Sequence, residues 1–179
     1  MSRTHALDRW LYRGRRAHWL ARRINGATAR LAASGRGPSQ LYTLEVRGRR
    51  SGQVIRFPVV VAEYEGERYL VSMLGSDTNW ARNVRAADGR ALLVRGRREA
   101  VRLVEVDSGD RGAILRHYLA CSPGAQSHID MSPTAPVAEF DEVAPQYAIF
   151  RVAVLAEVPP DQTANQRENA IGAGDLRTL

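Results

Sequence analysis

Apolar residues recur at helical spacing along the first part of the chain, from Leu7 to Leu31. Trp10, Leu11 and Ile24 fall on one side of this pattern, and arginines fill much of the other side. A period of about 3.6 residues predicts an amphipathic helix. The glycines and the proline within residues 35–38 end the pattern. We therefore expect a basic helical extension over residues 1–36, ahead of the main domain.

From residue 40 the apolar period changes to two, which is typical of strands. Three such stretches cover residues 40–47, 54–62 and 68–74, and a basic turn at Gly48–Gly52 separates the first two. Pro58 has no N–H to give to a neighbouring strand, so the second stretch should be an edge strand or contain a bulge. Short strands joined by tight turns pair antiparallel, because parallel pairing needs long crossovers.

The second half of the chain alternates between the two periods. It first predicts a helix from about Asp77, its expected N-cap, to Asp88–Gly89, and then a hairpin of strands 91–95 and 99–106. A helix over 110–120 follows, which should bury Ile114, Leu115, Tyr118 and Leu119. The last elements are a short helix around Phe140 and a strand over 147–154. The pattern is that of an α+β, barrel-like domain of about six mainly antiparallel strands, with two or three short helices. We place this domain at residues 37–156 and expect a disordered tail over 157–179.

Charge is concentrated at the N-terminus. All 26 basic residues are arginines, and the net charge is +7. Residues 1–36 hold nine arginines against one acid, which leaves 17 arginines against 18 acids in the rest. The basic helix packs on the domain with its arginines in water, or it lies against an anionic membrane surface or an acidic partner. No apolar run is long enough to span a membrane, so we expect a cytoplasmic protein, with membrane association as the alternative.

Several kinds of catalytic site are excluded. Cys121 is the only cysteine, and the four histidines lack metal-ligand spacing, so we expect no metal site. Ser122 and Ser127 lack the context of a nucleophile elbow, and no Walker or Rossmann glycine pattern occurs. The strands alternate as core-facing strands do, without exposed aromatics among basic residues, so nucleic-acid binding is not expected.

Two segments carry candidate chemistry. In the turn, Gly48 and Gly52 let a backbone come close to a phosphate, while Arg49, Arg50 and the Ser51 hydroxyl offer hydrogen-bond donors. The second segment, Gly75–Asn83, opens a helix whose free backbone N–H groups favour an anionic or carbonyl-bearing ligand. Each segment also has a purely structural interpretation, as a basic hairpin turn and as a helix packed on the sheet.

Together these segments resemble the deazaflavin-dependent nitroreductase and quinone reductase family. The family has a strand, then Gly-Arg-(Lys or Arg)-Ser-Gly, then a strand with proline and aliphatic residues, and later a glycine followed by Trp-x-x-Asn. The resemblance covers about residues 38–155. It implies a split β-barrel that binds coenzyme F420, a hydride carrier with a phosphate-bearing, polyanionic tail. By position, the implied cofactor residues are Arg49, Arg50, Ser51, Gly52, Arg56, Pro58, Met73, Gly75, Ser76, Trp80 and Asn83.

The chain departs from this pattern at Ile55. The family commonly has an arginine at this position, and here the arginine comes one residue later, at Arg56. A shift of one residue in a strand moves a side chain to the opposite face. Unless a bulge compensates, a tail-phosphate ligand is therefore missing.

The implied reaction is hydride transfer from reduced deazaflavin to a small electron-poor acceptor such as a quinone, a nitroarene or an activated alkene. Tyr118, Tyr147 or water are the candidate proton donors. The alternatives are the same fold with FMN or without a cofactor in a biosynthetic pathway, and a non-catalytic module that binds an anionic membrane or nucleic acid. The sequence leaves the oligomeric state open, a homodimer included.

Overall fold

The computed structural model describes residues 32–35, 38–107 and 109–158. The predicted helix from Leu7 to Leu31, and with it the proposed membrane contact, lies outside these residues. The predicted tail also lies outside them from residue 159 onward. Residues 157 and 158, which we assigned to that tail, belong instead to the last strand, Ile149–Val158.

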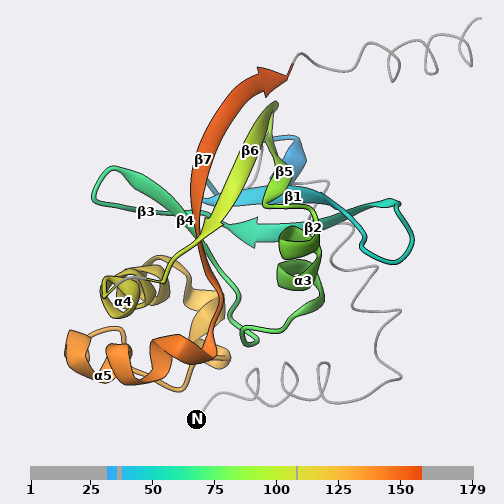
Figure 1. Ribbon diagram of the computed structural model, residues 1–179. Coiled ribbons are helices and arrows are strands. Elements are labelled where there is room, and N and C mark those ends of the chain that lie inside the picture. The colour runs from blue at the N-terminus through green and yellow to red at the C-terminus, as the bar shows by residue number, and fades with distance from the viewer. Residues whose placement is uncertain (1–31, 36–37, 108, 159–179) are drawn as a thin grey trace, which may run out of the picture.

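The described chain forms one sheet of seven antiparallel strands (Figure 1). Their order across the sheet is β2-β1-β5-β6-β7-β4-β3. The strands are β1 (Leu41–Arg47), β2 (Val54–Val60), β3 (Ala62–Tyr64), β4 (Glu67–Val71), β5 (Arg90–Arg95), β6 (Arg97–Glu105) and β7 (Ile149–Val158).

The sequence predicted about six strands because the pattern over residues 54–62 is that of a single strand. This stretch divides at Val61, whose N–H donates to the carbonyl of Gln40. The chain then leaves β1 and pairs as β3 with β4, where Ala62 faces Tyr69. Consecutive strands β2 and β3 thus stand at opposite edges of the sheet, which curls into a half-barrel. Pro58 lies on β2, an edge strand, as predicted.

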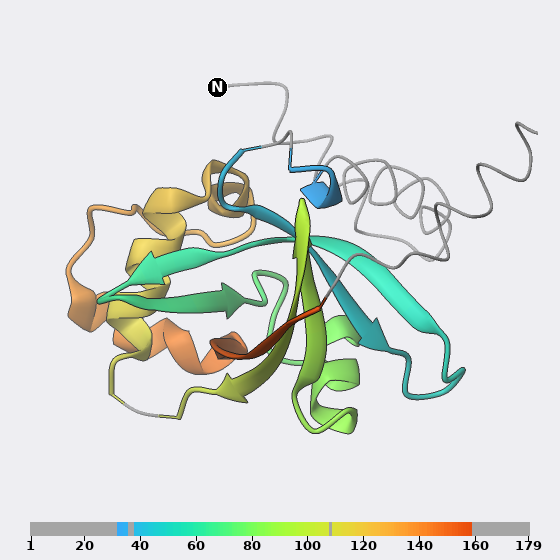
Figure 2. The same ribbon diagram turned by 90° about the horizontal axis from the view of Figure 1, so that it is seen from above.

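The helices occur close to where the sequence predicts them. They are α3 (Asn79–Ala86), α4 (Arg111–Cys121) and α5 (Val137–Val143), with short 3-10 turns at Pro123–Ser127 and Ala144–Gln146. The predicted buried side of α4 is confirmed, since Ile114, Leu115, Tyr118 and Leu119 are at most 1% exposed. Helices α4 and α5 pack together at one end of the sheet, whereas α3 lies apart from them (Figure 2).

The expected N-cap at Asp77 is wrong. Thr78 takes the N-cap position of α3, and no side chain accepts a hydrogen bond from the helix there. Asp77 forms an ion pair with Arg82 in the helix instead. This partner, rather than the backbone amides, takes up the carboxylate charge.

Strand β4 and the first residues of β7 bury both of their faces. Leu70 and Phe150 pack into a cluster with Leu44, Leu93 and Val84 of α3. The neighbouring residues Tyr69, Val71 and Ile149 face a second cluster with Leu115, Leu119 and Phe140 of the α4–α5 end. Because side chains alternate along a strand, one pair of strands serves two cores. The sheet therefore holds α3 and α4 at fixed places on either side of the cleft described next.

Candidate functional site

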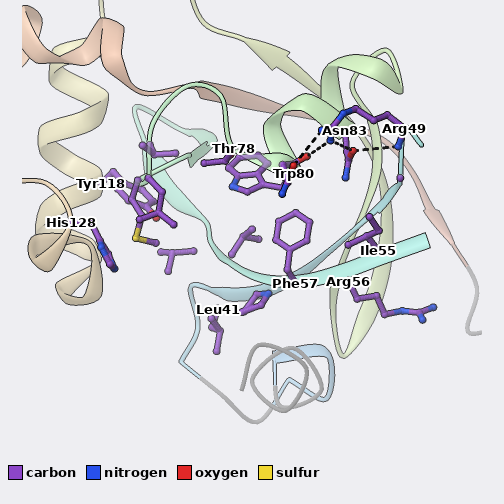
Figure 3. Close-up of a pocket in the computed structure, with 18 of the residues that line it drawn as sticks. Leu41, Arg49, Ile55, Arg56, Phe57, Thr78, Trp80, Asn83, Tyr118 and His128 are labelled. Atoms are coloured by element: carbon purple, nitrogen blue, oxygen red, sulfur yellow. Dashed lines mark hydrogen bonds between the residues drawn. The ribbon is translucent and has the colours of Figure 1, made fainter. Parts of the chain in front are cut away.

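A cleft of about 780 Å³ runs past the edge strand β2, from the Gly48–Gly52 turn to α4. Figure 3 shows Arg49 and Asn83 at one end, Tyr118 and His128 at the other, and Trp80 and Phe57 between them. This volume is within the range of roughly 300–1,000 Å³ that is usual for small-molecule sites.

Most of the residues predicted to form the site meet in this cleft. It is lined by Arg49, Arg50, Ser51, Arg56, Pro58, Met73, Trp80, Asn83 and Tyr118. Gly52, Gly75, Ser76 and Tyr147 are not among its lining residues. Gly52 and Gly75 instead shape the two loops, each with a positive φ, of 67° and 108°.

The basic turn is closed by two short backbone hydrogen bonds. The N–H of Gly48 donates to the carbonyl of Gln53, and the N–H of Gly52 donates to the carbonyl of Gly48, both at 2.8 Å. A Cβ at Gly48 would lie 2.9 Å from both Ile55 Cδ1 and Ser51 Oγ, so a larger residue there would displace one of these side chains. The Ser51 hydroxyl accepts from the N–H of Gln53 and still has its own proton to donate.

Arg49 joins the two predicted segments to each other. Its Nη1 donates to Asn83 Oδ1 at 2.8 Å, and its Nη2 donates to Asn79 Oδ1 at 3.3 Å. The backbone N–H of Arg49 also donates to Asn83 Oδ1, at 3.3 Å. Asn83 is buried, at 3% exposure. The turn and the first turns of α3 are therefore held together by a guanidinium.

Arg56, unlike Arg49, is bound to a carboxylate on the neighbouring strand. The pairing of β1 with β2 is unbroken from Leu41–Val60 to Arg47–Val54, so no bulge compensates for the shifted arginine. Arg56 faces Glu45, with its Nε 2.7 Å from Oε1, and Figure 3 shows its guanidinium directed away from Trp80 and Phe57. Arg56 therefore contributes to the rim of the cleft, and Ile55 takes the face toward the Gly48 turn.

The middle of the cleft is aromatic. The Trp80 ring lies 5.8 Å from that of Phe57 and 5.5 Å from that of Phe150, measured between centroids. Ser72 Oγ and Thr78 Oγ1 share a hydrogen bond of 2.7 Å that fixes the loop leading into α3. Trp80 is half-buried, so one part of its ring belongs to the core and another lines the cleft.

Asp77, directly before the lining residue Thr78, places a carboxylate next to the loop that leads into α3. The hydrogen bond from Arg82 lowers its pKa, and the nearby charges of Arg82 and Arg85 act in the same direction. Asp77 is thus ionised, and its charge is paired with Arg82.

The far end of the cleft is formed by α4 and the loop after it. Tyr118 is 1% exposed, and burial raises the pKa of its hydroxyl to about 12, against a small opposing effect of a hydrogen bond with Ser122. His128 lies beside it (Figure 3). Tyr147, the other candidate proton donor, packs in the α4–α5 core, where burial raises its pKa and its carbonyl accepts from Arg111.

Sequence reasoning missed several lining residues, including Leu41, Ile55, Phe57, Thr78, Asn79 and His128. Strand alternation carried a signal for Phe57, since it shares a face with Ile55 on β2. Leu41 and His128 had no such signal, because only the curl of the sheet brings them together.

Within residues 32–35, 38–107 and 109–158, no group of His, Cys, Asp and Glu is arranged to hold a metal ion. In the same part of the chain, no helix has the length and apolar character needed to cross a membrane.

The sequence profile of a family described as F420H(2)-dependent quinone reductase matches residues 13–137. None of the curated proteins that were compared matches the chain.

Solved structures similar to this chain include an F420-H2 dependent reductase, FDR-A, at 16% identity (64% of this chain, 94% of that chain, TM-score 0.44). A protein of unknown function from Agrobacterium tumefaciens is also 16% identical (82% and 70%, TM-score 0.48). A third structure, described as a domain-swapped dimer, is 15% identical (76% and 98%, TM-score 0.46). All three likenesses are distant.

Proposed function

Because the chain belongs to the F420H(2)-dependent quinone reductase family, we propose that it transfers hydride from reduced coenzyme F420 to an electron-poor acceptor. The acceptor would be a quinone, a nitroarene or an activated alkene. The observation that carries the proposal is the cleft itself, which combines an arginine turn with an aromatic wall in one continuous space.

The residues of the cleft suit the two unlike parts of this cofactor. At the turn, the exposed Arg50 and the Ser51 hydroxyl supply donors for a phosphate. Along the middle, Trp80, Phe57 and Met73 supply an apolar surface for a planar ring. The volume of about 780 Å³ is large enough for a drug-sized ligand.

When bound, the cofactor supplies a two-electron hydride, and the protein supplies position and electrostatics. Arg50 and Ser51 would hold the anionic end, while Trp80 and Phe57 would orient the ring and exclude water from one of its sides. Tyr118 holds a proton on Oη at neutral pH, since its pKa is about 12. It lines the end of the cleft opposite the arginines, which makes it our candidate for donating a proton to the reduced acceptor.

One observation favours a second cofactor. Arg56 is paired with Glu45 through its Nε, and its guanidinium is directed away from Trp80 and Phe57, so it is less available to a polyanionic tail. FMN carries a single phosphate and needs fewer cations. The same cleft with FMN is therefore the rival proposal.

Titration of the purified protein with F420 and with FMN, followed by fluorescence quenching, distinguishes the two. We expect F420 to bind at micromolar concentration or tighter. The Arg50→Ala variant should bind F420 about tenfold more weakly or worse, because a charge-assisted hydrogen bond is lost. Arg90→Ala is the matched control, since Arg90 is exposed and does not line the cleft. Binding of FMN without binding of F420 would support the rival instead.

A further inference from the structure

Three arginines line the cleft near the turn: Arg49, Arg50 and Arg56. They differ in what already holds them. We propose that Arg49 is a positioning residue that fixes α3 and Trp80 against the turn, and that Arg50 alone of the three binds the anionic tail of the cofactor. This inference rests on the proposed function.

The guanidinium of Arg49 is directed at the protein. Its Nη1 lies 2.8 Å from Asn83 Oδ1 and 3.4 Å from the carbonyl oxygen of Asn79. Its Nη2 lies 3.3 Å from Asn79 Oδ1. These two nitrogens form the fork with which an arginine grips a phosphate or a carboxylate. Here both of them are turned toward the start of α3.

The contact between Arg49 and α3 is made to a buried acceptor, the side chain of Asn83. The side chain is 3% exposed, and its Oδ1 accepts from both the backbone N–H and the guanidinium of Arg49. A buried acceptor that loses its donors is strongly unfavourable. Trp80 lies on the same helix, between Asn79 and Asn83, and its ring packs against that of Phe57 at 5.8 Å between centroids. The contacts of Arg49 therefore set the distance between the turn and the aromatic wall.

Arg56 is held by a different partner, through its Nε. Glu45 is 8% exposed and also binds Arg98 at 2.9 Å, so two guanidinium groups share this carboxylate. Because the register of β1 and β2 has no bulge, the strand keeps Arg56 on the face of Glu45. Arg50, by contrast, is exposed, and among the described residues no hydrogen bond or ion pair holds its side chain. Of the three, Arg50 is the one whose guanidinium has no partner among the described residues, and it is therefore the one most available to a ligand.

The two roles predict different responses to the ligand. Loss of a tail ligand weakens only a cofactor that has the tail, whereas loss of a positioning residue weakens any ligand that uses the aromatic wall. The ratio of the two affinities therefore separates a tail ligand from a positioning residue. A circular dichroism spectrum that matches the wild type shows that a loss shared by both compounds is not a loss of folding.

The test measures binding of F420 and of the same deazaflavin without its phosphate tail, by fluorescence, in the full-length protein. For Arg50→Ala we expect about tenfold or greater loss for F420 and no loss for the tail-free compound. For Arg49→Ala we expect loss by the same factor for both compounds. Arg90→Ala is the control for the removal of one positive charge. A loss confined to F420 in Arg49→Ala would overturn the proposal.

Asn83→Ala provides a second variant in case Arg49→Ala does not fold. It removes the acceptor that holds Arg49 and adds no charge, so both compounds should lose affinity by the same factor. If Arg49 instead binds the tail, its release from Asn83 would leave F420 binding at least as tight as in the wild type, which refutes the inference. A wild-type protein that binds the tail-free deazaflavin as tightly as F420 refutes it too. Absence of binding for both compounds would overturn the proposed function itself.

Discussion

Tyr118 is the most deeply buried tyrosine of the described residues. It is 1% exposed, on the inner side of α4, and it also lines the end of the cleft. Burial disfavours the phenolate and raises its pKa to about 12, while a hydrogen bond with Ser122 acts in the opposite direction. A group in this state remains a proton donor over the whole physiological range of pH.

This shift predicts how stability changes in alkali. The folded pKa lies above the value of about 10 in the unfolded chain, so folding favours the protonated form. The stabilisation is complete below pH 10 and is lost as pH rises toward 12. It amounts to about 2–3 kcal/mol. Tyr118→Phe should therefore lose less free energy of unfolding than the wild type between pH 10 and 12.

Urea unfolding at pH 8, 10, 11 and 12 measures this difference, with Tyr42→Phe as a control that removes a hydroxyl elsewhere. Equal losses in the wild type and in Tyr118→Phe would contradict the burial of a protonated Tyr118.

At the scale of elements, α4 owes its place to a close approach to α5. A Cβ on Gly112 would collide with Asp141 Oδ1 and would lie 2.7 Å from the Asp141 backbone nitrogen. Backbone cannot move aside as the end of a side chain can. The two helices are therefore held closer than any larger residue at position 112 would allow, and α4 in turn supplies Tyr118 to the cleft.

Gly112→Ala should accordingly destabilise the protein by about 1–3 kcal/mol, as overpacking does. Gly109→Ala is the matched control, since nothing lies within 4 Å of its added methyl group. Chemical denaturation of both variants, compared with the wild type, measures the effect. A Gly112→Ala protein as stable as the Gly109→Ala protein would show that α4 and α5 are less tightly packed than described.

Most strands were predicted from the sequence, but one break between strands and the contacts between distant segments were not. Period-two alternation predicted β1 and β6, and the hairpin around Gly96 predicted β5. Pro58 left two choices for β2, an edge position or a bulge, and β2 is an edge strand without a bulge. The break between β2 and β3 was not predicted, because Val59, Val60, Val61 and Ala62 form one apolar run. The consequence of moving the arginine from position 55 to position 56 was predicted, since it depends only on strand geometry. The partners of Arg49 were not, because they lie 30 and 34 residues further along the chain.

At the scale of the whole molecule, the cleft exists because the sheet curls. Strand β2 and the start of α3 form one end, and α4 with His128 forms the other, so no single segment contains the site. The two motifs were enough to predict the family and the cationic end. At the far end Tyr118 was a predicted candidate, whereas Leu41 and His128 were not, since their meeting depends on closure between parts of the chain that share no local pattern.

The most direct test of the proposed function follows the reaction itself. The protein would be mixed anaerobically with reduced F420 and a water-soluble quinone, and the deazaflavin absorbance recorded against a protein-free control. We predict protein-dependent oxidation of the cofactor, with one quinone reduced for each reduced F420 consumed, and a much lower rate in Trp80→Ala. If the protein binds F420 but the cofactor is oxidised no faster than in the control with quinones, nitroarenes and activated alkenes alike, hydride transfer to such acceptors is contradicted.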